Sequence, residues 1–339
     1  MRPIVSSLKV TAGRIFLAAV YSAIASTAIA QTCQTSSDLD EATRTALSAS
    51  AQRYFDMAAK ADIASMRQSS IPSLASDFSG IENSIRARQS ELQGAHASVK
   101  SLFLLEADGA APIPNAQFYC GVFGANGQTA GSAAFSLGNL PPGKYGVVIL
   151  EAQSAHNRTN FSLILQLVGN NWKIGGLYIK AAQIGGHDSD WFLARAREYR
   201  AAGKSLNAWL FYLEARSLAA PLTFMTTLVT DKLYDESKAI RPADVPADGK
   251  TADLAGSAAT YKLTAIFPET VGSDLDLIVK YQAADISNSN QAYQTNVNVM
   301  SALLKKFPEL REAFAGIVAR AVDPKGRDYG TLLAMKDIK

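Results

Sequence analysis

The chain has 339 residues, with 33 Lys and Arg against 30 Asp and Glu, two cysteines and three histidines. Three of the 33 bases and none of the acids lie in residues 1–30, so the rest of the chain carries 30 charges of each sign. A neutral chain without a basic run lacks the electrostatic footprint of nucleic-acid-binding proteins. The cysteines and histidines are too scattered for a zinc pattern, and no phosphate-loop motif occurs. We therefore expect no nucleic-acid partner, no metal site and no cofactor.

Residues 1–30 have the three parts of a secretory signal peptide. Basic residues open the segment, residues 15–24 are mostly apolar, and Ala28-Ile29-Ala30 ends it. The apolar part is shorter than the roughly 20 residues that span a bilayer, and an uncleaved anchor is the alternative. We predict cleavage before Gln31 and a secreted or periplasmic protein that is not inserted in the membrane after cleavage.

Residues 38–93 are predicted to form three helices. Asp38 with Glu41 and Ser79 with Glu82 have the spacing of capping boxes that begin the first and third helices. The apolar residues expected to be buried are Leu47, Ala51, Tyr54, Phe55 and Ala58 in the first helix, Ile63 and Met66 in the second, and Ile81, Ile85 and Leu92 in the third.

From Val99 onward the pattern changes to strands separated by turns. The expected strands cover 99–106, 117–123, 133–140, 145–152, 161–167 and 172–180. Strict alternation from Phe161 to Leu167 predicts a half-buried strand. The glycine-rich stretch 124–131 is interpreted as a hairpin loop, because no Lys-Ser/Thr and no helix follow it. Helices followed by a run of antiparallel strands predict an α+β fold, with three N-terminal helices packed on a curved antiparallel sheet.

The last strand of this block reads Asn171-Trp172-Lys173-Ile174-Gly175-Gly176-Leu177-Tyr178-Ile179. With three helices before the curved strands, it resembles the nuclear transport factor two-like superfamily of cone-shaped domains, whose last strand often reads W-K-I-x-x-x-x-I. The resemblance covers about 38–182 and implies a domain over 31–185. It implies a fold and no particular activity, because that fold hosts isomerases, hydrolases, binding modules and assembly domains.

The resemblance implies a ligand pocket on the concave face of the sheet. The polar-tipped residues proposed to line it are Tyr119, Tyr145, Glu151, Gln166 and Tyr178. An isomerase of this superfamily pairs a carboxylate base with a hydroxyl donor, so Glu151 would be the base and Tyr119 or Tyr178 the donor. The alternative places Glu151 where solvent begins and the tyrosine hydroxyls at the rim of the core. We favour the alternative, because the predicted strand 161–168 offers no Lys or Arg to pair with Glu151.

Cys33 and Cys120 are the only cysteines. In an oxidising compartment they can pair, and two buried thiols are the alternative. We predict a disulfide that ties the N-terminal segment to the second strand. The histidines His96, His156 and His187 have no catalytic spacing, and Asp188 with Ser189 is interpreted as a helix start.

Residues 186–239 are predicted to be helical. Tyr199, Gly203, Ala208, Tyr212 and Ala215 have the spacing of one tetratricopeptide unit, which the helical hairpin resembles. A single repeat cannot bury its own face, so we expect it to pack on the cone domain or on a helix over 222–239.

Residues 240–257 have the composition of a linker. A small ββαββ domain is expected over 258–339, with strands at 261–267 and 275–283 and a hairpin of 313–322 with 329–335. The apolar stripe of its helix is expected to be Tyr293, Val297, Met300, Leu304 and Phe307, with the helix ending at Pro308.

These patterns contain no nucleophile–base pair, metal cluster or cofactor loop. The leading hypothesis is an exported, non-enzymatic binding or assembly protein, whose partner would be a small apolar ligand, another protein or a second copy of the chain. The alternatives are a small-molecule isomerase or hydrolase that uses the cone, and peptide binding by the helical hairpin. A cone that holds a carboxylate and a hydroxyl would support the enzyme, and a cone filled by aromatic side chains would support assembly.

Overall fold

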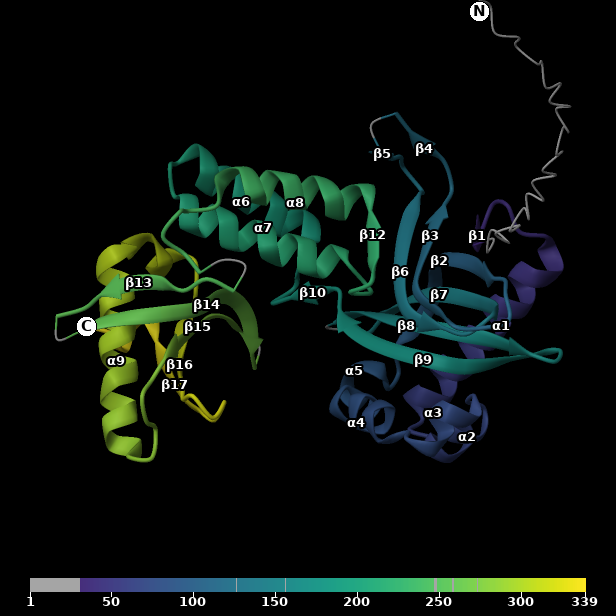
Figure 1. Cartoon of the computed structure of the whole chain (residues 1–339), viewed down its shortest axis with the longest axis horizontal. Helices are drawn as coiled ribbons and strands as arrows, with labels where there is room; N and C mark the ends of the chain where they lie inside the picture. Colours follow the sequence, from purple (N-terminus) through teal and green to yellow (C-terminus); the bar gives the residue numbers. More distant parts are fainter. Residues whose placement is uncertain (1–30, 126, 156, 247–248, 258, 273) are drawn as a thin grey trace, which may run out of the picture.

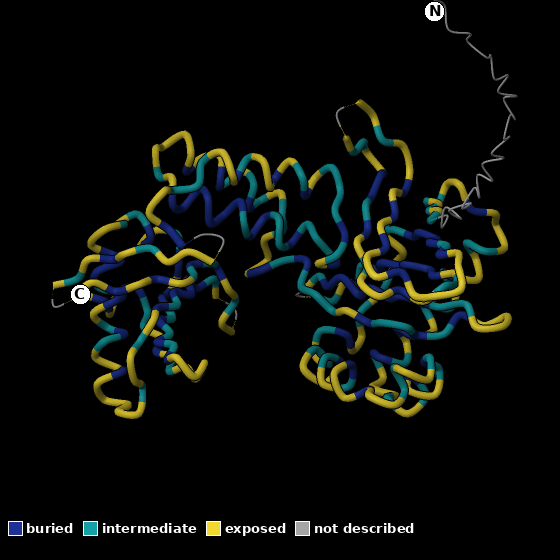
Figure 2. Tube along the Cα trace, viewed as in Figure 1, coloured by how far each residue is buried: buried dark blue, intermediate teal, exposed yellow. Residues whose placement is uncertain are grey.

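The computed structural model describes residues 31–125, 127–155, 157–246, 249–257, 259–272 and 274–339. The predicted signal peptide and His156 lie outside these residues. The described part has the predicted α+β class, with an N-terminal lobe and a C-terminal lobe joined by three helices (Figure 1). Buried residues concentrate in the sheets and in the central helix of the connection (Figure 2).

The N-terminal lobe begins with strand β1 (Gln31–Thr35), followed by a group of short and long helices. These are α1 (Glu41–Ala59), α2 (Ile63–Gln68), α3 (Pro72–Ser76), α4 (Ser79–Ala87) and α5 (Gln89–Leu92). Every residue of the apolar stripes predicted for the helices over 38–93 is buried, except Ile63, which is half-buried. The hydroxyl of Tyr54 donates to the main-chain oxygen of Trp172 at 2.6 Å, which joins α1 to the edge of the sheet.

Both predicted capping boxes are wrong. Asp40 caps α1 by accepting a hydrogen bond from the Thr43 amide, whereas Asp38 accepts from the amide and hydroxyl of Thr35 and closes the turn after β1. No side chain caps α4, because the hydroxyl of Ser79 donates instead to Asp77. In each case the side chain that was expected to cap the helix forms a hydrogen bond with a nearby residue outside the helix instead.

Five antiparallel strands form the main sheet of this lobe. Its order is β1-β2-β7-β8-β9, with β2 (His96–Ala107), β7 (Gly143–Gln153), β8 (Arg158–Val168) and β9 (Asn171–Ala181). One face packs on the helices, where the rings of Phe55 and Phe161 meet edge to face at 5.3 Å. Side chains therefore fill the space between helices and sheet.

A second sheet covers the opposite face of the first. It has the order β12-β6-β3, with β3 (Ile113–Cys120), β6 (Ala133–Leu140) and β12 (Met225–Thr227). Phe103 of the first sheet and Phe135 of the second meet edge to face at 5.2 Å. The strands therefore form two sheets in two layers, and the prediction of one curved sheet is wrong. The prediction that 161–167 is a half-buried strand is also wrong, because Ser162 and Ile164 are buried and β8 is thus covered on both faces.

Two small hairpins complete the lobe. Strands β4 (Phe123–Gly124) and β5 (Gly127–Gln128) form a hairpin in the glycine-rich stretch, as interpreted from the sequence. Strands β10 (Gln183–Ile184) and β11 (His187–Asp188) lead out of the sheet through a turn in which Gly185 and Gly186 have positive φ angles of 55° and 80°. Glycine adopts this conformation without steric cost. Cys33 of β1 and Cys120 of β3 form a disulfide.

Three helices connect the lobes: α6 (Ser189–Ala201), α7 (Ser205–Ala219) and α8 (Leu228–Ile240). Asp188 caps α6 by accepting from the Trp191 amide, as the helix-start interpretation predicts. Helix α7 is buried along most of its length, between α6, α8 and the C-terminal lobe. The predicted hairpin therefore packs on both its following helix and the C-terminal sheet.

The C-terminal lobe is a five-stranded sheet with one covering helix. Its order is β13-β14-β15-β16-β17, with β13 (Ala252–Ala255), β14 (Thr260–Val271), β15 (Asp274–Gln282), β16 (Gly316–Val322) and β17 (Asp328–Ala334). Helix α9 (Ser289–Lys306) connects β15 to β16, which pair in parallel. Single 3₁₀ turns lie at Pro308–Glu312 and Met335–Asp337.

Two expectations for this lobe need correction. The range 240–257, expected to be a linker, contains β13, and Leu254 is fully buried because its strand pairs with β14. Of the predicted stripe of α9, Met300 and Leu304 are buried, but the rest of the buried face is formed by Ala292, Asn296, Val299, Ala302 and Leu303. Asn296 turns inward because it binds Tyr281 and Thr331, which leaves Tyr293 exposed.

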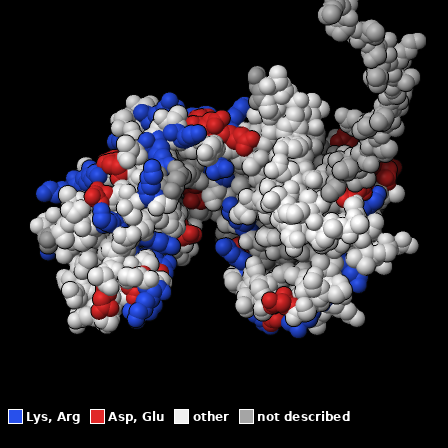
Figure 3. Space-filling view, in the orientation of Figure 1, with Lys and Arg blue, Asp and Glu red and all other residues white. Residues whose placement is uncertain are grey.

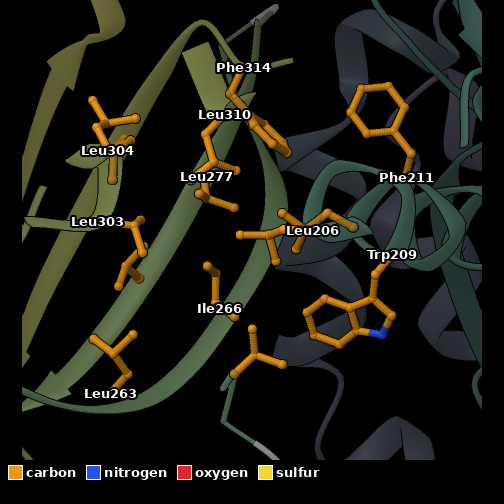
Figure 4. Packing of buried hydrophobic residues seen from close by; sticks show 14 of the residues in the cluster. Leu206, Trp209, Phe211, Leu263, Ile266, Leu277, Leu303, Leu304, Leu310 and Phe314 are labelled. Atoms are coloured by element: carbon orange, nitrogen blue, oxygen red, sulfur yellow. The ribbon is translucent and has the colours of Figure 1, made fainter. Parts of the chain in front are cut away.

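The helical connection and the C-terminal sheet share one hydrophobic core. Leu206 and Phe211 of α7 meet Ile266 and Leu277 of the sheet, and Phe314 packs edge to face on Phe211 with ring centres 5.9 Å apart (Figure 4). The three helices are therefore joined to the C-terminal lobe by apolar packing, and to the N-terminal lobe by β10, β11 and β12.

Candidate functional site

Four of the five candidate pocket residues lie on one face of the main sheet. Tyr145 pairs with Gln166, Glu151 with Asn160, and Ser162 with Tyr178, and directly paired residues point to the same side. This is the face turned away from α1–α5. The fifth candidate, Tyr119, lies on the second sheet (β12-β6-β3), which we call the outer sheet. Tyr119 is 60% exposed and its hydroxyl donates to Gln117 at 2.9 Å.

The tyrosines of this set are engaged elsewhere. The hydroxyl of Tyr145 donates to the main-chain oxygen of Pro141 at 2.8 Å, and burial raises the pKa of this phenol. Tyr178 packs edge to face on Phe224, and burial raises its pKa as well. Gln166 lies beside Gly143. The structure therefore brings no tyrosine hydroxyl opposite the Glu151 carboxylate.

Glu151 has a partner that the sequence argument missed. Its Oε2 accepts a hydrogen bond from Nζ of Lys100 at 3.2 Å. Lys100 is the extra residue of a bulge in β2, where Val99 pairs with Leu150 and Ser101 with Ile149. The sequence argument looked for a partner only on the predicted strand 161–168, whereas the bulge lies in β2, on the other side of β7. No periodicity signal marks a bulge of this kind.

Glu151 lies at the edge of a cleft of about 510 Å³. The cleft lies between the outer face of the main sheet, the turn before β6, the start of α6 and the β12–α8 segment. Its apolar lining includes Phe103, Ile149, Leu218 and Met225, which come from β2, β7, α7 and β12. We call it the apolar cleft.

Ion pairs line the edge of the apolar cleft. Besides Lys100 with Glu151, Arg158 pairs with Asp188 at 2.7 Å and also donates to Gln183 at 3.2 Å. The hydrogen bond from Arg158, with that from the Trp191 amide, holds the pKa of Asp188 below its usual value. Four of the five charged residues that line the apolar cleft are therefore matched in two pairs, and the exposed Asp190 is the fifth.

A second cleft of about 660 Å³ lies between the two lobes. Charged side chains line it: Arg88, Glu91, Arg158, Lys180, Glu214 and Glu269. We call it the charged cleft. Burial, assisted by the charge of Glu269, raises the pKa of Glu214 to about 7, whereas burial lowers the pKa of Lys180. Perturbed carboxyl and amine groups in a cleft are a physical sign of a functional site.

Sequence reasoning did not find the charged cleft. Glu214 lies in an otherwise apolar helix and Lys180 at the end of a strand, and only the folded chain brings them together. A buried-helix pattern interrupted by one acid was the available signal.

Charge is distributed unevenly over the surface. Residues 109–143, which form the outer sheet and its turns, contain no Asp, Glu, Lys, Arg or His. Figure 3 shows this largely uncharged surface beside the charged helices and C-terminal lobe.

Among the described residues, no group of three His, Cys, Asp or Glu is arranged to hold a metal ion. None of the helices in this part of the chain is long and apolar enough to cross a membrane. Comparisons with protein-family models, curated proteins and solved structures find no match.

Proposed function

We propose that the protein is an exported, non-enzymatic binding protein whose apolar cleft takes a small, mostly apolar ligand. One observation carries this proposal: apolar side chains from β2, β7, α7 and β12 line one cleft, together with the two ion pairs Lys100–Glu151 and Arg158–Asp188. Ligand sites are typically concave, largely apolar and equipped with a few polar groups that orient the ligand.

The arrangement of Glu151 argues against the isomerase alternative. That alternative needs Glu151 as a base opposite the hydroxyl of Tyr119 or Tyr178. Glu151 instead pairs with Lys100, Tyr119 donates a hydrogen bond to Gln117, and Tyr178 packs on Phe224.

Export is part of the same proposal. Disulfides persist in oxidising compartments, and the Cys33–Cys120 disulfide is compatible with one. N-terminal sequencing of the product outside the cytoplasm should begin at Gln31. Recovery of the intact chain from Met1 in the membrane fraction would contradict it.

The ligand proposal is tested with N-phenyl-1-naphthylamine, an apolar probe whose fluorescence rises in apolar sites. Val229 lines the apolar cleft and is 51% exposed, so Val229→Trp should fill the cleft without disturbing the core. We expect the probe to bind the unaltered chain and to bind Val229→Trp about tenfold more weakly, a loss of ~1.4 kcal/mol.

The matched control is Val168→Trp. Val168 is 40% exposed and does not line the apolar cleft. This variant should bind the probe like the unaltered chain, and circular dichroism should show both variants folded. Equal binding by the two tryptophan variants would overturn the proposal.

A second candidate function is assembly of two copies through the outer sheet. Val122 is 74% exposed on a surface whose 109–143 stretch carries no charge. A two-fold interface places the same patch on both copies, so an uncharged patch meets itself without like-charge repulsion. Sedimentation should show a dimer for the unaltered chain and a monomer for Val122→Asp, and a monomer in both would exclude this assembly.

A further inference from the structure

The charged cleft contains one buried carboxylate, that of Glu214, for which the described residues supply no hydrogen-bond donor. Glu214 lies on α7, is 6% exposed and lines the charged cleft. Within the described residues no hydrogen bond or ion pair reaches its carboxylate. A buried carboxylate without a donor is costly, and such groups normally have a charged or N–H partner.

The cations around the charged cleft are already engaged. Arg88 pairs with Glu91 at 2.8 Å, and Arg158 pairs with Asp188 at 2.7 Å. Lys180 donates to the main-chain oxygens of Ser217 at 2.6 Å and Ala220 at 3.0 Å. Lys180 attracts Glu214 through space but directs these two N–H groups to the end of α7.

A second carboxylate lines the charged cleft from the C-terminal lobe. Glu269, on β14, also lines the charged cleft and is close enough for its negative charge to disfavour ionisation of Glu214. Among the described residues, its one hydrogen-bond donor is the neighbouring Thr270 amide at 3.3 Å, which leaves acceptor capacity on both carboxylates. Two carboxylates with spare acceptor capacity in one cleft attract a cation with several N–H donors.

We propose that the charged cleft binds the primary ammonium group of an organic amine, with Glu214 and Glu269 accepting its N–H groups. An ammonium carries three donors and one charge, which matches two carboxylates partly offset by Lys180. A metal ion fits less well, because the described residues contain no group of three ligating side chains. The charged cleft shares Arg158 and Leu218 with the apolar cleft, but Glu214 and Glu269 line only the charged cleft. Failure of the amine proposal therefore leaves the proposed function standing.

The ammonium group could come from a polyamine or from an amino acid, and two probes distinguish them. Titration calorimetry of the chain from Gln31 to Lys339 uses putrescine, L-alanine and uncharged 1,4-butanediol. Binding of putrescine alone assigns the site to polyamines. Binding of L-alanine alone assigns it to amino acids, and binding of both assigns it to primary amines with or without a carboxylate. If neither amine binds more tightly than 1,4-butanediol, the proposal is wrong.

Two variants tie the binding to the two carboxylates. Glu214→Gln keeps the size of the side chain, and Glu269 is exposed, so Glu269→Gln leaves the core intact. Each should weaken amine binding about tenfold, because a charge-assisted hydrogen bond becomes a neutral one. The control is Glu41→Gln, an exposed acid in α1. Equal affinities in all three variants would overturn the assignment.

The pH dependence gives an independent readout. The charged groups that face Glu214 across the charged cleft are Lys180, Glu269, Arg88, Glu91 and Arg158. Glu214 titrates near neutrality among them, whereas an aliphatic ammonium stays protonated to about pH 10. Amine affinity should therefore rise from pH 6 to pH 8 and lose this rise in Glu214→Gln. A rise that persists in Glu214→Gln contradicts the role of this carboxylate.

Discussion

Lys180 of the main sheet donates a hydrogen bond to the main-chain oxygen of Ser217 at 2.6 Å, across the junction between β9 and the last turn of α7. The last carbonyl groups of a helix lack intrahelical donors, and a nearby cation is favourable there. This contact therefore fixes the end of α7 against the N-terminal lobe and explains why a half-buried lysine remains in the sheet.

Lys180→Met should lower the free energy of unfolding by about 1–3 kcal/mol, because a charged hydrogen-bond donor is lost from carbonyl groups that stay buried. Urea denaturation measures the change. Lys173→Met is the matched control, since Lys173 is a half-buried lysine of the same strand. Equal effects of both substitutions would mean that the lysine stem and not its ammonium group stabilises the junction.

Glu214 should make the protein less stable as the pH rises. Its pKa is about 7 in the folded chain against an ordinary 4.5, so the folded state binds the proton more tightly. The penalty is absent below about pH 4.5, grows between pH 4.5 and 7, and then stays constant. Glu214→Gln should therefore raise stability at pH 8 by about 2–3 kcal/mol and leave it nearly unchanged at pH 4. Thermal unfolding at both pH values checks this, and parallel profiles would refute it.

Removing the disulfide should destabilise the N-terminal lobe. Cys33 and Cys120 are 87 residues apart in sequence. In the chain-entropy model a loop of this length corresponds to about 4 kcal/mol. We expect guanidinium denaturation to show that the double variant Cys33→Ala, Cys120→Ala loses roughly that much free energy of unfolding. In the unaltered protein, mass spectrometry of non-reduced peptides should show the two cysteines linked. Free thiols on both residues in protein purified without reductant would refute the pairing.

Asn296 should be the most sensitive polar residue of α9. Its Oδ1 accepts from the Tyr281 hydroxyl at 2.8 Å, and its Nδ2 donates to the Thr331 hydroxyl at 2.9 Å. Asn296→Ala leaves these buried groups without partners and should cost about 2–4 kcal/mol. Asn298→Ala, at an exposed position of the same helix, should change stability by less than about 0.5 kcal/mol. A small effect at Asn296 would show that its partners find other donors and acceptors.

The order of elements could be predicted because hydrophobic periodicity is local. The strand at 133–140 has the predicted bounds, and the stripe from Leu47 to Ala58 is buried as expected. The division into two sheets could not be predicted, because periodicity gives no information on which strands pair. β3 and β6 pair with each other and lie across the main sheet instead of extending it.

The candidate site could be predicted only in part, because it too depends on which strands and helices pack together. The sequence placed Glu151 at the end of a buried run, where it is indeed only half-buried, but it did not give the bulge that brings Lys100 to it. Glu214 lies in the helical connection and Glu269 in the C-terminal lobe, and the two approach through tertiary packing. Local patterns do not report on such contacts, so the charged cleft was outside the reach of sequence reasoning.

The core shared by α7 and the C-terminal sheet has a consequence for how the protein unfolds. Leu206 and Phe211 would face water if the sheet were removed, since Ile266 and Phe314 cover them. The helical connection and the C-terminal lobe should therefore melt together as one cooperative unit, separate from the lobe closed by the disulfide. The helical pair is consequently not a portable module: excised alone, it would expose the apolar surface that its sheet normally shields, and it would aggregate before it could bind anything.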